Sequence, residues 1–378
     1  MDFPTPIQFD VPPSQKGSLV MQLRIFRPLR YWLLLGGILL LAPGLVVAQF
    51  PTGGLSGDAM LRTLKTRMEA RDETARALNR KDAMTVVLVG TGSPLPSDRA
   101  QASTAIFVNG QFLLFDCGDG ASRSIDSLNL PIGQLDTVFL THYHSDHFAD
   151  LGEIIDRSWI QGRRHVLSVY GPTGITEILD GFIRAYRLEH GYRTAHHGPA
   201  IMPSEYASAE AKPFEADTSG KPMTVYDEMG IVVKAFAVNH PPVDPAVGYR
   251  VEYAGKVVVI SGDTTSTASL VEQSRDADLL CAEVMNMSVV EQMEKANEQL
   301  GNASIAHILR DIRSYHIDVH QLGELAEQSK VRRLALTHLV PPVPKAAAGL
   351  LFKAPVGEHY RGEIIVGDDG TKIVLPLE

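Results

Sequence analysis

The stretch "LTHYHSDHFADLGE" constrains this chain most, because three histidines and an aspartate fall within six residues directly after an apolar run. The preceding "TVFL" is apolar and largely β-branched or aromatic, which predicts a buried strand. Alternate residues of an extended chain share one side, so we expect His142, His144 and Asp146 on one face, while His147 points elsewhere and begins a helix. Imidazoles and carboxylates crowded at a strand end predict a metal site rather than a solvated loop.

Three further residues of ligand type follow separate apolar runs later in the chain. His240 follows "AFAV", Asp263 ends "VVVISGD" and His338 ends "LALTH". Zinc suits this set of imidazoles and carboxylates, and manganese and iron fit it as well.

The motif "THYHSDH" resembles the H-x-H-x-D-H signature of the metallo-β-lactamase superfamily of binuclear metallohydrolases. The likeness extends over residues 86–342, where "VLVGTGSPLPSDRAQAS", "LLFDCGDG" and "YHIDVHQLGELAEQSKVRRLALTHLVPP" are similar to the ribonuclease Z and arylsulfatase-like branch. The resemblance implies an α/β fold, namely the four-layer αββα sandwich of the metallo-β-lactamase fold, and a metal-dependent hydrolase.

The resemblance also implies which side chains would hold each of two zinc ions. It assigns His142, His144, His240 and Asp263 to one ion, and Asp146, His147, Asp263 and His338 to the other, so that Asp263 bridges them. Two dications lower the pKa of a shared water, so that hydroxide is available near neutral pH to attack an ester.

Three residues are candidates for catalysis. Asp146 would orient the attacking water, and Glu283 with His316 resembles a Glu–His relay that protonates the leaving group in ribonuclease Z. The residues that follow this pair differ from the nuclease, since Val-Met follows the glutamate and Ile-Asp follows the histidine. A helix-capping or supporting histidine is therefore the alternative role for His316. We expect Asp116, in "LLFDCGDG", to orient a histidine ligand.

The N-terminal segment predicts export. Counted from Met21, the arginines between residues 24 and 30 form a positive segment, and the apolar run 32–48 ends in small residues, so cleavage is expected after Ala48. Residues 1–48 are thus predicted as an N-terminal extension plus signal peptide, with Met21 as the true start, and the enzyme as periplasmic or secreted. An uncleaved anchor is the alternative, and it would be the only membrane contact.

The remaining chain predicts a linker and helix over residues 49–83, then one hydrolase domain over residues 84–378. Asn109-Gly110 predicts a hairpin turn, and the weakly periodic residues 192–225 predict a long surface loop or lid. The predicted strands are 85–90, 104–109, 112–116, 137–142, 166–171, 231–238, 247–253, 256–263, 278–284 and 332–338. The predicted helices are 149–161, 174–188, 266–277, 305–314 and 320–328, and an apolar stripe from Leu61 to Leu78 predicts one more, packed on the outside of the domain.

The charge of the chain disfavours a nucleic-acid partner. The 35 lysines and arginines against 44 aspartates and glutamates give a formal net charge of −9, with a pI near 5.8. Phosphate contacts from basic residues supply much of the affinity for nucleic acid, and the chain has no basic runs interleaved with aromatics. It also lacks the Gly/Pro-rich basic arm that grips tRNA in ribonuclease Z. We therefore expect a small anionic ester as substrate and do not expect nucleic acid.

The expected function is an exported binuclear zinc hydrolase that cleaves a sulfate ester or a phosphodiester. The alternatives are a ribonuclease Z that matures tRNA 3′ ends, a β-lactamase or lactonase, and a non-catalytic binding protein, which the complete ligand set disfavours. A homodimer is compatible with each. We expect Cys117 and Cys281 as separate buried thiols rather than a disulfide, and His196-His197 as solvated. Arg99 would meet either an anionic substrate or a salt-bridge partner.

Overall fold

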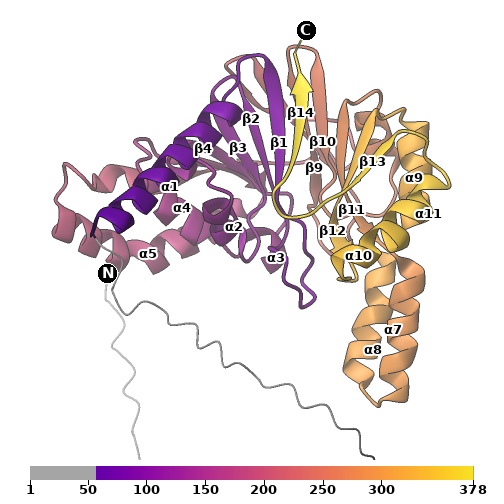
Figure 1. Ribbon diagram of the computed structural model, residues 1–378. Helices are drawn as coiled ribbons and strands as arrows, with labels where there is room; N and C mark the ends of the chain where they lie inside the picture. Colours follow the sequence, from indigo (N-terminus) through magenta and orange to yellow (C-terminus); the bar gives the residue numbers. More distant parts are fainter. Residues whose placement is uncertain (1–56, 378) are drawn as a thin grey trace, which may run out of the picture. The chain divides into compact units, whose positions relative to one another are not determined.

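Two seven-stranded sheets form the centre of the part of the chain that the computed structural model describes, residues 57–377 (Figure 1). The predicted signal peptide and nearly all of the predicted linker lie outside these residues. The first sheet has the order β14 (Thr371–Pro376), β1 (Ala83–Gly90), β2 (Ser103–Val108), β3 (Gln111–Phe115), β4 (Leu135–Phe139), β5 (Leu167–Pro172) and β6 (Ala209–Phe214). The second has the order β13 (Glu363–Val366), β12 (Arg333–Val340), β11 (Leu279–Met285), β10 (Lys256–Ile260), β9 (Val247–Tyr253), β8 (Ile231–Ala237) and β7 (Met223–Glu228).

Helices flank this pair of sheets, with α1, α4 and α5 on one side and α9 and α11 on the other (Figure 1). The helices are α1 (Gly57–Leu78), α2 (Ala121–Ser127), α3 (Ser145–Phe148), α4 (Leu151–Ile160), α5 (Ile175–His197), α6 (Ala268–Gln273), α7 (Met287–Gln299), α8 (Ala303–Asp311), α9 (Val319–Gln328), α10 (Lys345–Ala348) and α11 (Ala354–Gly357). Short 3-10 turns cover Ile132–Gln134, Ser204–Tyr206 and Ile312–Ser314, and a π-helical turn covers Gly349–Lys353.

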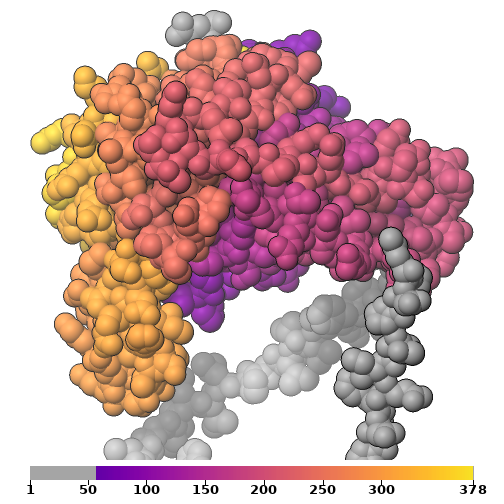
Figure 2. All heavy atoms as spheres, turned by 180° about the vertical axis from the view of Figure 1, so that it is seen from behind, coloured from indigo at the N-terminus to yellow at the C-terminus, as the bar shows by residue number. Residues whose placement is uncertain are grey.

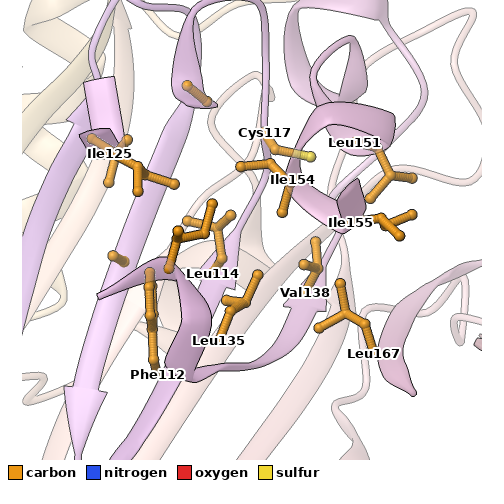
Figure 3. Packing of buried hydrophobic residues seen from close by; sticks show 14 of the residues in the cluster. Phe112, Leu114, Cys117, Ile125, Leu135, Val138, Leu151, Ile154, Ile155 and Leu167 are labelled. Atoms are coloured by element: carbon orange, nitrogen blue, oxygen red, sulfur yellow. The ribbon is translucent and has the colours of Figure 1, made fainter. Parts of the chain in front are cut away.

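Three apolar clusters separate four layers. Leu114 of β3 and Val138 of β4 face outward and pack against Ile125 of α2 and Ile154 of α4 (Figure 3). Alternate residues of the same strands point to the opposite face of the sheet, where Phe115 and Phe139 meet the second sheet in a shared inner cluster.

The third cluster lies on the outer face of the second sheet, where Leu280 of β11 packs with Leu322 of α9. The predicted αββα sandwich is therefore confirmed. The predicted hairpin is confirmed too: β2 and β3 pair antiparallel, with Val108 opposite Gln111, and Asn109 and Gly110 both have positive φ.

The strand directions bring the candidate ligands to one edge. Strands β10, β11 and β12 run parallel, and β8 runs the same way because β9 between β8 and β10 is antiparallel to both. His240 therefore follows β8 at the same edge where Asp263 follows β10. The histidine-rich turn leaves the carboxyl end of β4 in the other sheet and begins α3. Strands β4, β8 and β10 thus place candidate ligands directly after their carboxyl ends.

His338 does not end its strand, as the sequence had predicted, but lies inside β12. Thr337 pairs with Glu283 and Leu339 with Val284, so His338 is an extra residue in the ladder, with φ 45°. Such a bulge redirects a side chain away from the regular alternation. It turns the His338 imidazole toward the other ligands, and a left-handed conformation in a non-glycine residue is typical of strained functional sites.

The prediction of one long loop or lid over residues 192–225 is wrong in part, since only residues 198–208 and 215–222 lie outside α-helices and strands. Helix α5 continues to His197, and β6 and part of β7 fall within this segment as the edge strands of the two sheets. Edge strands bury few side chains, and they often carry charged residues and proline, which prevent pairing with a strand of another molecule. Lys212 and Pro213 in β6 fit that pattern, so its apolar alternation is too weak to detect from sequence.

Two helices differ from what the sequence predicted: α7 was not predicted, and α1 packs differently from the expectation. The sequence did not predict α7, because it lies against α8 rather than on a sheet and buries only Val290 and Glu294. The apolar stripe of α1 was predicted to pack on the domain, yet Leu61, Leu64 and Met68 are 46–68% exposed. Among residues 57–377, no helix is both long and apolar enough to span a membrane.

Candidate active site

The first group of candidate ligands surrounds the imidazole of His144. His144 Nδ1 lies 3.2 Å from His142 Nε2 and 3.2 Å from His240 Nε2. Asp263 Oδ2 lies 4.0 Å from His142 Nε2 and 3.9 Å from His240 Nε2. Each of these four side chains offers an atom within 4.8 Å of the others. The structure therefore gathers the set predicted for one ion, with His144 reaching the surface and the other three buried.

The second group shares Asp263 with the first. His147 Nε2 lies 3.3 Å from Asp263 Oδ1 and 3.6 Å from Asp146 Oδ2, and His338 Nε2 lies 3.1 Å from Asp146 Oδ2. All four side chains are buried. Asp263 Oδ2 faces the first group and also lies 3.5 Å from His338 Nε2, while Oδ1 faces His147. The carboxylate thus lies between the two groups, as a bridging ligand must.

Two orphaned atoms indicate that these residues fit a bound cation. His147 Nε2 and Asp263 Oδ1 are buried without a hydrogen-bond partner, although they face each other at 3.3 Å. A buried polar atom without a partner is costly, and a divalent ion between a nitrogen lone pair and a carboxylate would satisfy both atoms. The two groups therefore suit two metal ions.

Burial and the neighbouring carboxylates shift the pKa values of the imidazoles in the two groups. Burial lowers the pKa of His142 and lowers that of His240 to about 4, which keeps both neutral as metal ligands must be. Burial also lowers the pKa of His338, but the carboxylates of Asp263 and Asp146 outweigh it and raise that pKa to about 9. The two buried carboxylates thus demand positive charge around them.

Supporting groups orient two of the imidazoles. Asp116 Oδ2 lies 2.8 Å from His147 Nδ1, and its two oxygens accept hydrogen bonds from the backbone N–H and the hydroxyl of Thr141. His240 Nδ1 donates to the backbone carbonyl of Tyr315 at 2.9 Å. Each bond leaves the Nε2 lone pair free to face a metal. The supporting role predicted for Asp116 agrees with this geometry.

Replacing Asp116 with asparagine is expected to weaken metal binding about 10- to 100-fold, because the amide cannot hold the His147 imidazole by a charged hydrogen bond. Competition with a chromophoric chelator would measure the affinity. Asp126→Asn is the matched control, since Asp126 lies at the surface beside Arg157. Metal retention equal to that of the parent protein would contradict the role assigned to Asp116.

The predicted proton relay is also assembled. His316 Nδ1 lies 2.8 Å from Glu283 Oε2, and Glu283 Oε1 accepts from the backbone N–H of Thr264 at 2.7 Å. Both side chains are buried, and the His316 ring stacks 5.6 Å from that of His338. Burial lowers the pKa of His316, but the Glu283 carboxylate outweighs this effect and raises it. A protonated imidazole beside the metal ligands is the form that donates a proton.

A cavity of about 340 Å³ opens onto this centre. It is lined by His144, Asp146, Asp263 and His316 on one side. The rest of the lining is Ser93, Pro94, Leu95, Ser145, Ile308, Ile312, Tyr315 and Val340. None of the described residues that line it is a lysine or an arginine. Sequence reasoning missed this apolar lining, because its members come from three separate segments of the chain.

The other candidate residues lie elsewhere. His196 and His197 end α5 at the surface, away from the two ligand groups. Arg99 is half-buried, donates to Thr91 Oγ1 and pairs with Asp368 at 3.2 Å, which is the salt-bridge alternative. Cys117 and Cys281 are separate buried thiols, as predicted.

The comparisons with known proteins identify the family. The sequence profile described as the metallo-β-lactamase superfamily matches residues 96–303. The chain belongs to this superfamily. It is 32% identical over 288 residues to a protein named ribonuclease Z from Mycobacterium marinum, with 75% of this chain and 96% of the relative covered. A ribonuclease Z from Mycobacterium bovis is 31% identical over 293 residues, with 75% and 95% covered.

Solved structures share the metallo-β-lactamase fold. The metallo-β-lactamase fold protein YhfI from Bacillus subtilis superposes with a TM-score of 0.55 at 20% identity, over 78% of this chain and all of that one. The short form of human tRNase Z gives a TM-score of 0.55 at 22% identity, over 77% and 99%. The predicted superfamily, fold and enzyme class are thus confirmed: the chain is a metal-dependent hydrolase.

The relatives overturn one expectation. Nucleic acid was not expected as a partner, yet relatives that match nearly over their full length are named ribonuclease Z. Net charge is a sum over the whole surface and does not set the local potential at a site. Bound divalent ions are the largest local charges where they bind, so an acidic chain can still present positive charge to a phosphate.

Proposed function

We propose that this protein is a zinc-dependent phosphodiesterase that cleaves a phosphodiester bond in RNA, as its relatives' name ribonuclease Z indicates. The observation that carries the proposal is the His316–Glu283 pair, held at 2.8 Å beside a complete set of seven candidate metal ligands. Relatives 31–32% identical over at least 95% of their own length support the same reaction.

Asp146, His316 and Glu283 would have separate roles in the reaction. When bound, two zinc ions would activate a water molecule and balance the charge of the scissile phosphate. Asp146 would orient the attacking water through its free acceptor capacity, and His316 would donate a proton to the leaving oxygen. Glu283 would hold His316 charged and aligned, since its second oxygen is fixed by the Thr264 N–H.

The lining of the cavity favours a singly charged ester. No lysine or arginine among the described residues lines it, so the metal ions would supply the positive charge that meets the substrate. A phosphodiester carries one negative charge, whereas a phosphomonoester carries nearly two near neutral pH. The site is therefore better matched to a diester than to a terminal phosphate.

The test is a substrate panel with and without chelator. Precursor tRNA, bis(4-nitrophenyl) phosphate, 4-nitrophenyl phosphate and 4-nitrophenyl sulfate would be assayed with the zinc-loaded protein. We expect both diesters to be cleaved, with activity lost after chelation and restored by zinc, and the phosphomonoester to be a poor substrate. Turnover of the sulfate alone, or diester cleavage that survives chelation, would refute the proposal.

A further inference from the structure

One wall of the cavity is apolar and lies beside the candidate metal ligands. Leu95 comes from the loop after β1, Ile308 from α8, Ile312 and Tyr315 from the turn that follows α8, and Val340 from the end of β12. Ile312 and Val340 belong to a small buried cluster, which Leu95 and Tyr315 extend. The wall is therefore packed from behind.

Ile308 is 53% exposed although it lines a cavity. Single exposed apolar residues are common on protein surfaces. Here Leu95 and Tyr315 line the same cavity as the exposed Ile308 side chain, and apolar side chains gathered around a cavity commonly mark a ligand-binding site.

Tyr315 joins this wall to the reacting groups. Its ring centroid lies 5.0 Å from that of His316 and 5.1 Å from that of His240, edge-on to the latter. Its backbone carbonyl accepts the hydrogen bond from His240 Nδ1. Tyr315 therefore belongs both to the apolar wall and to the immediate surroundings of the candidate metal ligands.

The helical hairpin of α7 and α8 that carries the wall is held by ion pairs. Arg310 pairs with Glu294 and Glu298, and Arg313 pairs with Glu291 and Glu294, at N–O distances of 2.5–2.8 Å. Seen from behind, the hairpin stands out from the body at the lower left (Figure 2). Because these arginines are engaged with glutamates, this face offers apolar contacts rather than cationic contacts to a phosphate chain.

We propose that Leu95, Ile308 and Tyr315 form a subsite for a planar aromatic group bonded to the scissile ester. Aromatic and apolar side chains bind bases and aryl rings without sequence selection, because every such ring has a π-face. The ring is a nucleobase if the substrate is RNA and an aryl group if it is a small diester. The inference rests on the proposed function, since it names what that site binds next to the phosphate.

The first test is kinetic. Ile308→Ala is expected to raise KM for bis(4-nitrophenyl) phosphate about three- to tenfold with kcat little changed. The lost contact would stabilise the bound substrate and the transition state equally. Leu95→Ala should act in the same direction. Ile305→Ala is the matched control, since Ile305 lies on the same helix, is 50% exposed and does not line the cavity. An equal KM for parent and Ile308→Ala proteins would overturn the subsite.

The second test does not depend on turnover. Ligand-detected NMR would measure binding of 4-nitrophenol and of cytidine to the parent, Ile308→Ala and Ile305→Ala proteins. Weaker binding of cytidine only in Ile308→Ala supports a nucleobase, and weaker binding of 4-nitrophenol alone supports an aryl group. Unchanged binding of both overturns the subsite even if diesters are cleaved. Altered binding without any diester cleavage would reject the proposed function and leave the subsite standing.

Discussion

Replacing Asp263 with alanine is expected to remove both metal ions and to lower kcat/KM by on the order of 10³-fold or more. Asp263 is the one candidate ligand that belongs to both groups, with Oδ1 3.3 Å from His147 Nε2 and Oδ2 3.9 Å from His240 Nε2. Metal ions supply several kcal/mol of charge stabilisation in such sites, and each 1.4 kcal/mol is about tenfold in rate. Elemental analysis of the purified variant would give the metal content per chain.

Two comparisons make that result specific to the bridge. Asp119→Asn is the control, because Asp119 is exposed and contributes to neither ligand group. His142→Ala should lose one ion and keep the other, since His142 belongs to the first group alone. If Asp263→Ala kept two ions per chain with an unchanged circular dichroism spectrum, the bridging assignment would be refuted.

His316→Ala is expected to slow cleavage of RNA about 10²- to 10⁴-fold, the usual contribution of a general acid. The effect should depend on the leaving group. A ribose hydroxyl must be protonated as it departs, whereas 4-nitrophenolate leaves without a proton. Turnover of bis(4-nitrophenyl) phosphate should therefore fall less than about tenfold. Single-turnover rates on both substrates would measure the difference.

Glu283→Gln completes this series. It keeps the shape of the side chain and removes the charge that raises the pKa of His316. The same dependence on leaving group should appear, with a smaller loss. If His316→Ala slowed both substrates equally, His316 would instead be a residue that positions a candidate metal ligand. Its ring stacks on that of His338 with a centroid distance of 5.6 Å, which would allow such a role.

Much of the candidate site was visible in the sequence because metal chemistry is local. A pair such as His142-x-His144 needs only an extended backbone to place two imidazoles on one side. Asp263 follows a strongly apolar strand, so its place at a strand end could be predicted, although the identity of the partner groups rested on the family resemblance. The sequence also predicted the ten strands with strong apolar runs. It missed β6, β7, β13 and β14, which are the four edge strands of the two sheets and have less apolar patterning.

Three features required the assembled fold. The bulge at His338 depends on the pairing of β11 with β12, which no local pattern encodes. The exclusion of nucleic acid failed because charge was summed over the whole chain rather than at the site. The predicted export depends on residues 1–48 alone and stays a prediction, testable by N-terminal sequencing of the protein recovered from the extracellular or periplasmic fraction.

By itself, the sequence determined the superfamily and predicted the residues of a two-metal site, because metal ligands and buried strands are encoded in short stretches of chain. The tertiary structure alone decided which side chains form the cavity beside the candidate metal site. Leu95 and Val340 are far in the sequence from Ile308 and Tyr315, and no apolar pattern along the chain links them. They become one apolar wall only when α8 and the end of β12 close around the cavity, since apolar contact is non-directional and leaves no local pattern.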